Sequence, residues 1–152
     1  MFPFFRAFVV NEKTRRDVMK ELNELSFPDD VRYAKSHEWA RLEGDKIKVG
    51  ISDYAQDQLG DIVFVELPEI GDTFGKGEEY GTVESVKAVS ELYMPVAGEI
   101  VEVNTAVPDN PDITKKDPYG QAWLIRIKPE NEAEFDRLMD AQAYQKFLET
   151  EA

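Results

Sequence analysis

Few side chains in this sequence have the chemistry of a conventional active site. The 152 residues contain no cysteine and one histidine, His37, which excludes thiolate nucleophiles, disulfides and metal sites built from cysteines or several histidines. Ser36 and Glu38 flank His37, and because neighbouring side chains on a strand point to opposite faces, Ser36 and Glu38 share a face that His37 does not. We expect His37, Trp39 and Trp123 to be structural residues, and we assign neither a catalytic residue nor a metal ligand.

One lysine, Lys87, is the candidate for a side chain displayed at a turn. The pattern Pro-x-x-Gly-acid occurs twice, at 68–72 and 95–99, which indicates two related hairpin units. Lys87 lies between the two copies, in the segment 81–91. We therefore expect it close to the connection between the two halves of a repeated structure.

The charge of the chain narrows the range of partners. Eighteen Lys and Arg residues stand against 31 Asp and Glu residues, so the net charge is −13 with the histidine neutral. The basic residues are scattered, and an acidic surface repels phosphate backbones, which argues against nucleic acid and favours basic protein faces. No apolar run approaches the roughly 20 residues of a membrane-spanning helix, so we expect no membrane insertion.

Beyond the first residues, the pattern predicts a mainly β domain. Apolar and polar residues alternate over 47–51 after a Gly-Asp turn, which is typical of a hairpin. The run 61–67 holds five apolar residues and predicts a strand covered on both faces. Further strands are predicted at 98–103 and 122–127, each bounded by turn residues.

Both ends of the chain show helical periodicity. Residues 1–26 form an N-terminal extension, in which apolar residues at three- and four-residue spacing predict an amphipathic helix over 12–25. A targeting role is the weaker interpretation, because that helix carries four acidic residues and transit peptides are acid-poor. The same spacing between 135 and 148 predicts a C-terminal helical segment. Residues 27–152 are accordingly predicted to form one domain.

At Glu84-Ser-Val-Lys87-Ala88 the sequence resembles the lipoyl-attachment hairpin of the glycine cleavage system H-protein family. The resemblance covers about residues 27–150, and the order and spacing of its strings around one lysine make it specific. The other strings are Phe27-Pro-Asp-Asp-Val-Arg-Tyr33, Ser36-His-Glu-Trp39, Val49-Gly-Ile-Ser-Asp53, Leu59-Gly-Asp-Ile-Val-Phe-Val-Glu-Leu-Pro68, Pro95-Val-Ala-Gly98, Pro118-Tyr-Gly120 and Trp123-Leu-Ile125.

The resemblance implies a mainly β, lipoyl-type barrel-sandwich hybrid of short hairpins with a C-terminal helical segment. It also implies that Lys87 carries lipoic acid in amide linkage and that the hairpin residues Glu84, Ser85, Val86 and Ala88 serve in its recognition. A cysteine-free chain would borrow in this way the dithiol that it lacks.

Members of the family are non-catalytic carriers, which implies a shuttle of the aminomethyl group and of reducing equivalents. The implied partners are a pyridoxal-phosphate glycine decarboxylase, a folate-dependent aminomethyltransferase, dihydrolipoamide dehydrogenase and a lipoyl-attaching enzyme. The residues matching Ser36, Glu38 and Glu91 are placed to line a cleft for the loaded arm, although Glu91 stands where aspartate is common and Gln58 where some relatives have histidine. We expect a monomer in the bacterial cytoplasm, with the mitochondrial matrix as the alternative.

Three alternative functions stay open at this point. A biotin domain displays its lysine on a similar fold, but methionines usually bracket that lysine, whereas Val86 and Ala88 bracket Lys87. A lipoate-relay protein would pass its lipoyl group to 2-oxo acid dehydrogenases. An unmodified interaction domain would retain only the fold, which the intact Glu84-Ser-Val-Lys-Ala88 string argues against.

Overall fold

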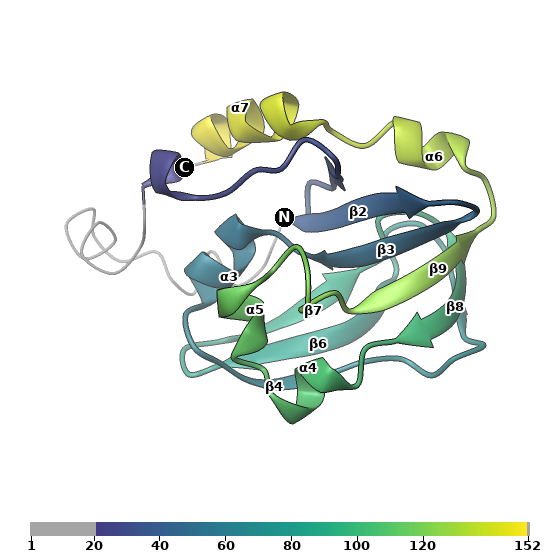
Figure 1. Cartoon of the computed structure of the whole chain (residues 1–152), viewed down its shortest axis with the longest axis horizontal. Helices are drawn as coiled ribbons and strands as arrows, with labels where there is room; N and C mark the ends of the chain where they lie inside the picture. The colour runs from purple at the N-terminus through teal and green to yellow at the C-terminus, as the bar shows by residue number, and fades with distance from the viewer. Residues whose placement is uncertain (1–20, 152) are drawn as a thin grey trace.

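The computed structural model describes residues 21–151, and it is built from two β-sheets packed face to face (Figure 1). A six-stranded sheet has the order β1-β2-β3-β9-β8-β5, and a three-stranded sheet has the order β4-β6-β7. The strands are β1 (Arg32–Tyr33), β2 (Glu38–Glu43), β3 (Lys46–Ile51), β4 (Ile62–Glu66), β5 (Thr73–Phe74), β6 (Glu79–Ser85), β7 (Val89–Tyr93), β8 (Gly98–Val103) and β9 (Ile125–Pro129). This confirms the predicted mainly β, barrel-sandwich architecture.

Short helices connect and flank the strands, and Figure 1 shows α6 and α7 together along one side of the molecule. They are η1 (Leu22–Glu24, a 3-10 helix), α3 (Asp53–Leu59), α4 (Ala106–Asp109), α5 (Ile113–Lys116), α6 (Ala133–Asp136) and α7 (Ala141–Glu151). The predicted C-terminal helical segment is thus confirmed as two helices. Within residues 21–151, no helix combines the length and apolarity needed to cross a membrane.

The β2–β3 hairpin forms where the alternating pattern predicts it. Gly44 adopts a φ of 65° in the turn, a conformation that glycine reaches without steric cost. Antiparallel pairing sets Leu42 opposite Ile47 and Ala40 opposite Val49. The side chains of Ile47 and Val49 are buried, so this hairpin supplies one wall of the core.

Two strand predictions need correction. The strand at 61–67 is β4, but its outer face is not covered, because Val63 and Phe64 are both exposed. A bulge between Ile62 and Phe64 turns two consecutive side chains outward. The strand predicted at 122–127 is β9 at 125–129, and Pro129, its last residue, pairs with Gly98.

The repeated Pro-x-x-Gly-acid motif brings its own two copies together. The backbone N–H of Gly71 donates to the carbonyl of Ile100 at 2.8 Å. The N–H of Ile100 donates to the carbonyl of Asp72, also at 2.8 Å. Gly98 is required at its position, because a Cβ there would lie 2.3 Å from Cγ2 of Ile127. Between the two copies, β6 and β7 form a hairpin whose turn carries Lys87, as predicted.

The core consists of two clusters. The larger lies between the two sheets and contains the buried aliphatic residues of β3, β8 and β9. The smaller is aromatic and lies under α7, where the rings of Tyr33 and Tyr144 stack at 4.4 Å. Leu25 and Phe27 pack against this cluster, so the residues just before β1 are part of the folded unit. The helix predicted over 12–25 falls mostly outside the described residues, and its described end is η1, after which Leu25 is extended.

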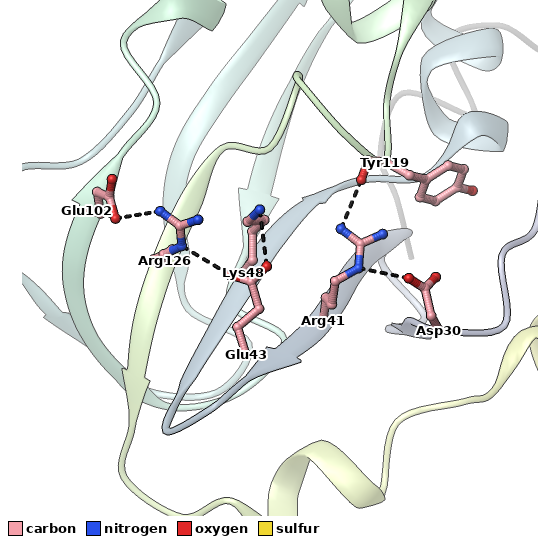
Figure 2. Close-up of polar contacts among 7 residues, drawn as sticks. All are labelled: Asp30, Arg41, Glu43, Lys48, Glu102, Tyr119 and Arg126. Carbon is pink, nitrogen blue, oxygen red and sulfur yellow. Dashed lines mark hydrogen bonds and ion pairs between the residues drawn. The ribbon is translucent and has the colours of Figure 1, made fainter.

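Charged side chains neutralise one another on the outer face of the larger sheet (Figure 2). Glu43 accepts from Lys48 at 3.1 Å and from Arg126 at 3.2 Å, and Arg126 also contacts Glu102 at 2.6 Å. The guanidinium of Arg126 lies 4.7 Å from the ring centroid of Trp123. Such half-exposed ion pairs each contribute at most about 1 kcal/mol. The two basic and two acidic side chains of this network therefore balance one another's charge.

Candidate functional site

The turn that carries Lys87 is shaped by the hydroxyl of Ser85. Its Oγ accepts the backbone N–H groups of Lys87 and Ala88, each at 3.1 Å. The backbone N–H of Ser85 donates in turn to the carbonyl of Ala88 at 2.8 Å. Serine favours turns because its hydroxyl can replace a backbone partner in this way. The turn is consequently fixed while the Lys87 side chain is exposed.

Residues from outside the hairpin support this turn. The N–H of Val86 donates to the carbonyl of Asp61 at 3.0 Å, which fastens the turn to the start of β4. Gly60 ends α3 with a φ of 78°, and a Cβ at that position would lie 3.5 Å from Cε of Lys87. The Lys87 side chain therefore begins its course over the end of α3. Gly60 and Asp61 lie outside the hairpin motif, so the motif alone does not indicate their contribution to the turn.

Ser36 and Glu38 are brought together as their spacing predicts. The Ser36 hydroxyl donates to Oε1 of Glu38, and the backbone N–H of Tyr93 donates to Oε2 at 3.1 Å. Since β7 is an edge strand of the smaller sheet, the Glu38 carboxyl satisfies a donor that the sheet itself leaves unpaired. Glu38 thereby joins the larger sheet to the edge of the smaller one.

Burial controls the charge of Glu38. The residue is completely buried, and the loss of hydration raises the pKa of its carboxyl from the usual 4.5 to about 8, against the hydrogen bonds from Ser36 and Tyr93. No lysine or arginine contacts the carboxyl among the described residues. Burial, with Glu38 nearby, also raises the pKa of Tyr80. At neutral pH Glu38 therefore holds a proton, which a nearby cation would displace.

Glu91 lies on β7 between Lys87 and the Ser36–Glu38 pair. Val89, Glu91 and Tyr93 alternate with buried residues, so their side chains share the outer face of the strand. With a rise of about 3.3 Å per residue, Tyr93 lies about 13 Å beyond Val89 along the strand. Glu91 makes no hydrogen bond with Ser36 or Glu38 among the described contacts. The structure thus brings two of the three predicted cleft residues into contact and sets the third on the path toward them.

An open cleft of about 790 Å³ lies at the far end of this path. Ser36 and Tyr93 line it, together with Met94 and the apolar side chains of Leu138 and Phe147. Loops from the start and the end of the domain therefore meet around the hydroxyl that contacts Glu38. A cleft of this kind can bury an apolar arm while a few polar groups orient its end.

His37 is buried in the core, which agrees with the structural role predicted for it. Its backbone has a φ of 77°, and Nδ1 of the ring lies 2.8 Å from the hydroxyl of Tyr144. Burial lowers the pKa of His37 to about 3, so the ring is neutral. Trp39 is also fully buried, and its indole N–H donates to the carbonyl of Pro118 at 2.9 Å. No cluster of three or more metal-ligating side chains occurs in the part of the chain that the structure describes.

Comparison with known proteins identifies the family to which this geometry belongs. The family model described as "Glycine cleavage H-protein" matches residues 31–151. The chain belongs to the glycine cleavage H-protein family. The match contains both the Lys87 turn and the Ser36–Glu38 pair, and it confirms the resemblance read from the sequence.

Individual H proteins are similar over nearly their whole length. The glycine cleavage system H protein of Bacteroides fragilis is 56% identical over 120 residues, which are 79% of this chain and 95% of that protein. The H protein of Thermus thermophilus is 54% identical over 128 residues, 84% of this chain and all of that protein. The crystal structure of an H protein from Mycobacterium marinum superposes with a TM-score of 0.74 at 42% identity, covering 80% of this chain and 98% of the other.

Proposed function

We propose that Lys87 is the lipoyl-attachment residue of this H protein. As a member of its family, the chain is a non-catalytic lipoyl carrier of the glycine cleavage system. The observation that carries the assignment is the exposed Lys87 on a turn that Ser85 holds in a fixed shape. A rigid turn presents the amine in one geometry to a modifying enzyme, which lowers the entropy cost of binding.

The residues around Lys87 fit an amide-linked lipoyl group. Gly60 has no side chain to obstruct the path of the arm, and the outer face of β7 continues that path past Val89 and Glu91. The bound group would supply a dithiol and disulfide, which the cysteine-free chain lacks. We infer that it shuttles an aminomethyl group and reducing equivalents between the enzymes of the system.

Ser36, Glu38 and Glu91 are proposed to hold the charged end of the loaded arm. An aminomethyl amine is cationic, and an opposite charge favours the ionised form of a carboxyl group. Glu38 would lose its proton to the solvent as the amine arrives, so the buried site gains a paired charge instead of an isolated one. The apolar side chains of the cleft would shield part of the carried group from water, beside the lysine and arginine side chains that also line it.

The partners follow from the same assignment. We propose that the carrier meets a pyridoxal-phosphate glycine decarboxylase, a folate-dependent aminomethyltransferase, dihydrolipoamide dehydrogenase and a lipoyl-attaching enzyme, as a monomer in the bacterial cytoplasm. The relatives named above are bacterial proteins. A net charge of −13 would speed encounters with basic faces on these enzymes.

Intact mass and peptide mapping of the protein from its own cells test the attachment. A lipoyl mass on Lys87 is expected, whereas a biotinyl mass, or a bare lysine in cells that lipoylate other proteins, would refute the proposal. Reconstituted glycine cleavage with Lys87→Arg as sole carrier provides the functional test. Full activity of that variant would remove the central claim, and Lys128→Arg, at an exposed lysine outside both the hairpin and the cleft, serves as the matched control.

A further inference from the structure

Exposed apolar side chains gather around the Lys87 turn. Six large apolar side chains of the described residues are strongly exposed, and four of them belong to β4 or to the β6–β7 hairpin. These four form the apolar patch: Val63 (54% exposed), Phe64 (51%), Val86 (66%) and Val89 (57%). The other two, Leu42 and Ile70, lie on β2 and in the loop before β5. Single exposed apolar residues are ordinary on a protein surface, but a cluster of them marks an interaction site.

The register of the strands places the patch on the outer face of the smaller sheet. Antiparallel pairing sets Phe64 opposite Glu84 and Glu84 opposite Val89, so the three side chains form a row across the smaller sheet. The bulge in β4 adds Val63 to this outer face. The hydrogen bond from Val86 to Asp61 draws the turn against β4, so the fourth member lies at the same end. The patch therefore adjoins Lys87.

Acidic side chains frame the patch. One step further along the strands, Glu66 pairs in register with Thr82 and Thr82 with Glu91, which forms a second row on the same face. Glu84 lies within the first row. Glu66 and Glu84 form no ion pair with any described residue. Glu84 thus lies between Phe64 and Val89, while Glu66 and Glu91 border the patch. Such a surface is complementary to a partner that presents both apolar and basic side chains.

We propose that the apolar patch and its acidic frame are the docking surface for the enzyme that attaches the lipoyl group to Lys87, and that this enzyme presents an apolar surface rimmed by lysine and arginine. The inference rests on the proposed function of Lys87. It adds the neighbouring strand β4 to the recognition element, which the sequence motif confines to the hairpin.

The position of the chemistry selects this partner. In the attachment step, the Lys87 nitrogen forms an N–C bond to the carbonyl carbon of an activated lipoyl adenylate. The bond from that carbon to the phosphate oxygen breaks, and AMP leaves with the electron pair. The Lys87 ammonium gives up two protons in becoming the amide nitrogen. That bond forms at Nζ itself, so the enzyme must cover the surface beside the turn. The other enzymes act at the far end of the arm. A second copy of this chain is disfavoured, because it would oppose two acidic frames on proteins of net charge −13.

The test measures lipoylation of the full apo-chain by a purified lipoate–protein ligase with lipoate and ATP, followed by intact mass. Phe64→Ser and Val89→Thr are expected to lower kcat/KM about tenfold each, mainly through KM, as for central interface residues. Ile70→Ser, an equally exposed apolar position outside the patch, is the matched control and is expected to match the parent. Far-UV circular dichroism and thermal unfolding establish that each variant is folded.

Two further measurements test the role of the acidic frame and the identity of the partner that binds the patch. Added salt is expected to lower kcat/KM of the parent, and Glu66→Lys combined with Glu84→Lys to reduce that salt dependence. Parent-like values for Phe64→Ser and Val89→Thr would overturn the docking proposal alone, whereas absence of lipoylation in the parent would overturn the function of Lys87 as well. An effect of the patch variants confined to dihydrolipoamide dehydrogenase turnover, or a concentration-dependent dimer that Phe64→Ser abolishes, would also overturn it.

Discussion

Replacing Glu38 by glutamine is expected to remove a large pH dependence of folding. Burial raises the pKa of Glu38 from 4.5 to about 8, so between these values the folded chain holds a proton that the unfolded chain lacks. The stabilisation is complete below the unfolded pKa and is lost as pH rises through the folded pKa. At about 1.4 kcal/mol per pH unit, the full interval corresponds to about 5 kcal/mol. About 3 kcal/mol of this lies between pH 5.5 and 8.

Urea unfolding followed by tryptophan fluorescence measures the effect, because Trp39 is fully buried. Measurements run from pH 5.5 to 8.5, which keeps the chain away from its pI of about 4.5 and from precipitation. The free energy of unfolding of the parent should fall with pH by about 3 kcal/mol more than that of Glu38→Gln. Glu99→Gln, at an exposed position of β8, separates the effect of burial from that of losing one carboxylate.

Two results would refute this reasoning. Equal pH slopes for the parent and Glu38→Gln would mean that Glu38 is already ionised in the folded chain. A rise of stability with pH, lost in the variant, would give the opposite sign and require a cation near Glu38. The same variant tests the cleft: the aminomethyl-loaded form should release its group faster while lipoylation is unchanged, because a buried acceptor is lost. Equal release rates would remove Glu38 from the arm site.

Three further predictions concern single contacts in the turn, the core and the ion-pair network. Ser85→Ala removes the acceptor of two backbone N–H groups, which should lower the free energy of unfolding by about 1 kcal/mol and speed hydrogen exchange at the Lys87 turn. Ser85→Thr keeps a hydroxyl and should retain the protection. Unchanged exchange in the alanine variant would contradict the role of the hydroxyl. Gly98→Ala places a Cβ within 2.3 Å of Ile127 and should lower the free energy of unfolding by about 1–3 kcal/mol. In Gly75→Ala the new Cβ meets the Glu78 side chain, and the loss of free energy should be smaller. Similar losses in the two variants would argue against the clash. Arg126→Met breaks the ion pairs with Glu43 and Glu102. Urea unfolding should show a loss of about 1 kcal/mol in the free energy of unfolding at low salt and a smaller loss at about 1 M salt. A loss that salt does not reduce would indicate packing against Trp123 instead.

The sequence by itself determined the local features of this H protein. The Gly-Asp turn and the alternation over 47–51 specify the β2–β3 hairpin, because strand periodicity and turn chemistry depend on adjacent residues. The repeated Pro-x-x-Gly-acid motif located the Lys87 turn between two related units. The two-residue spacing of Ser36 and Glu38 predicted their contact, although Ser36 itself precedes the strand.

The tertiary structure decided everything that depends on residues distant in sequence. Glu38 is buried where β2 meets the backbone of Tyr93, 55 residues later, and this burial raises the pKa of its carboxyl. No local pattern encodes that approach. Five apolar residues in seven predicted a strand for 61–67, but whether its outer face is covered depends on where other elements pack. The β4 bulge and the open face leave Val63 and Phe64 exposed beside Lys87, since apolar composition alone does not distinguish a buried face from a binding surface.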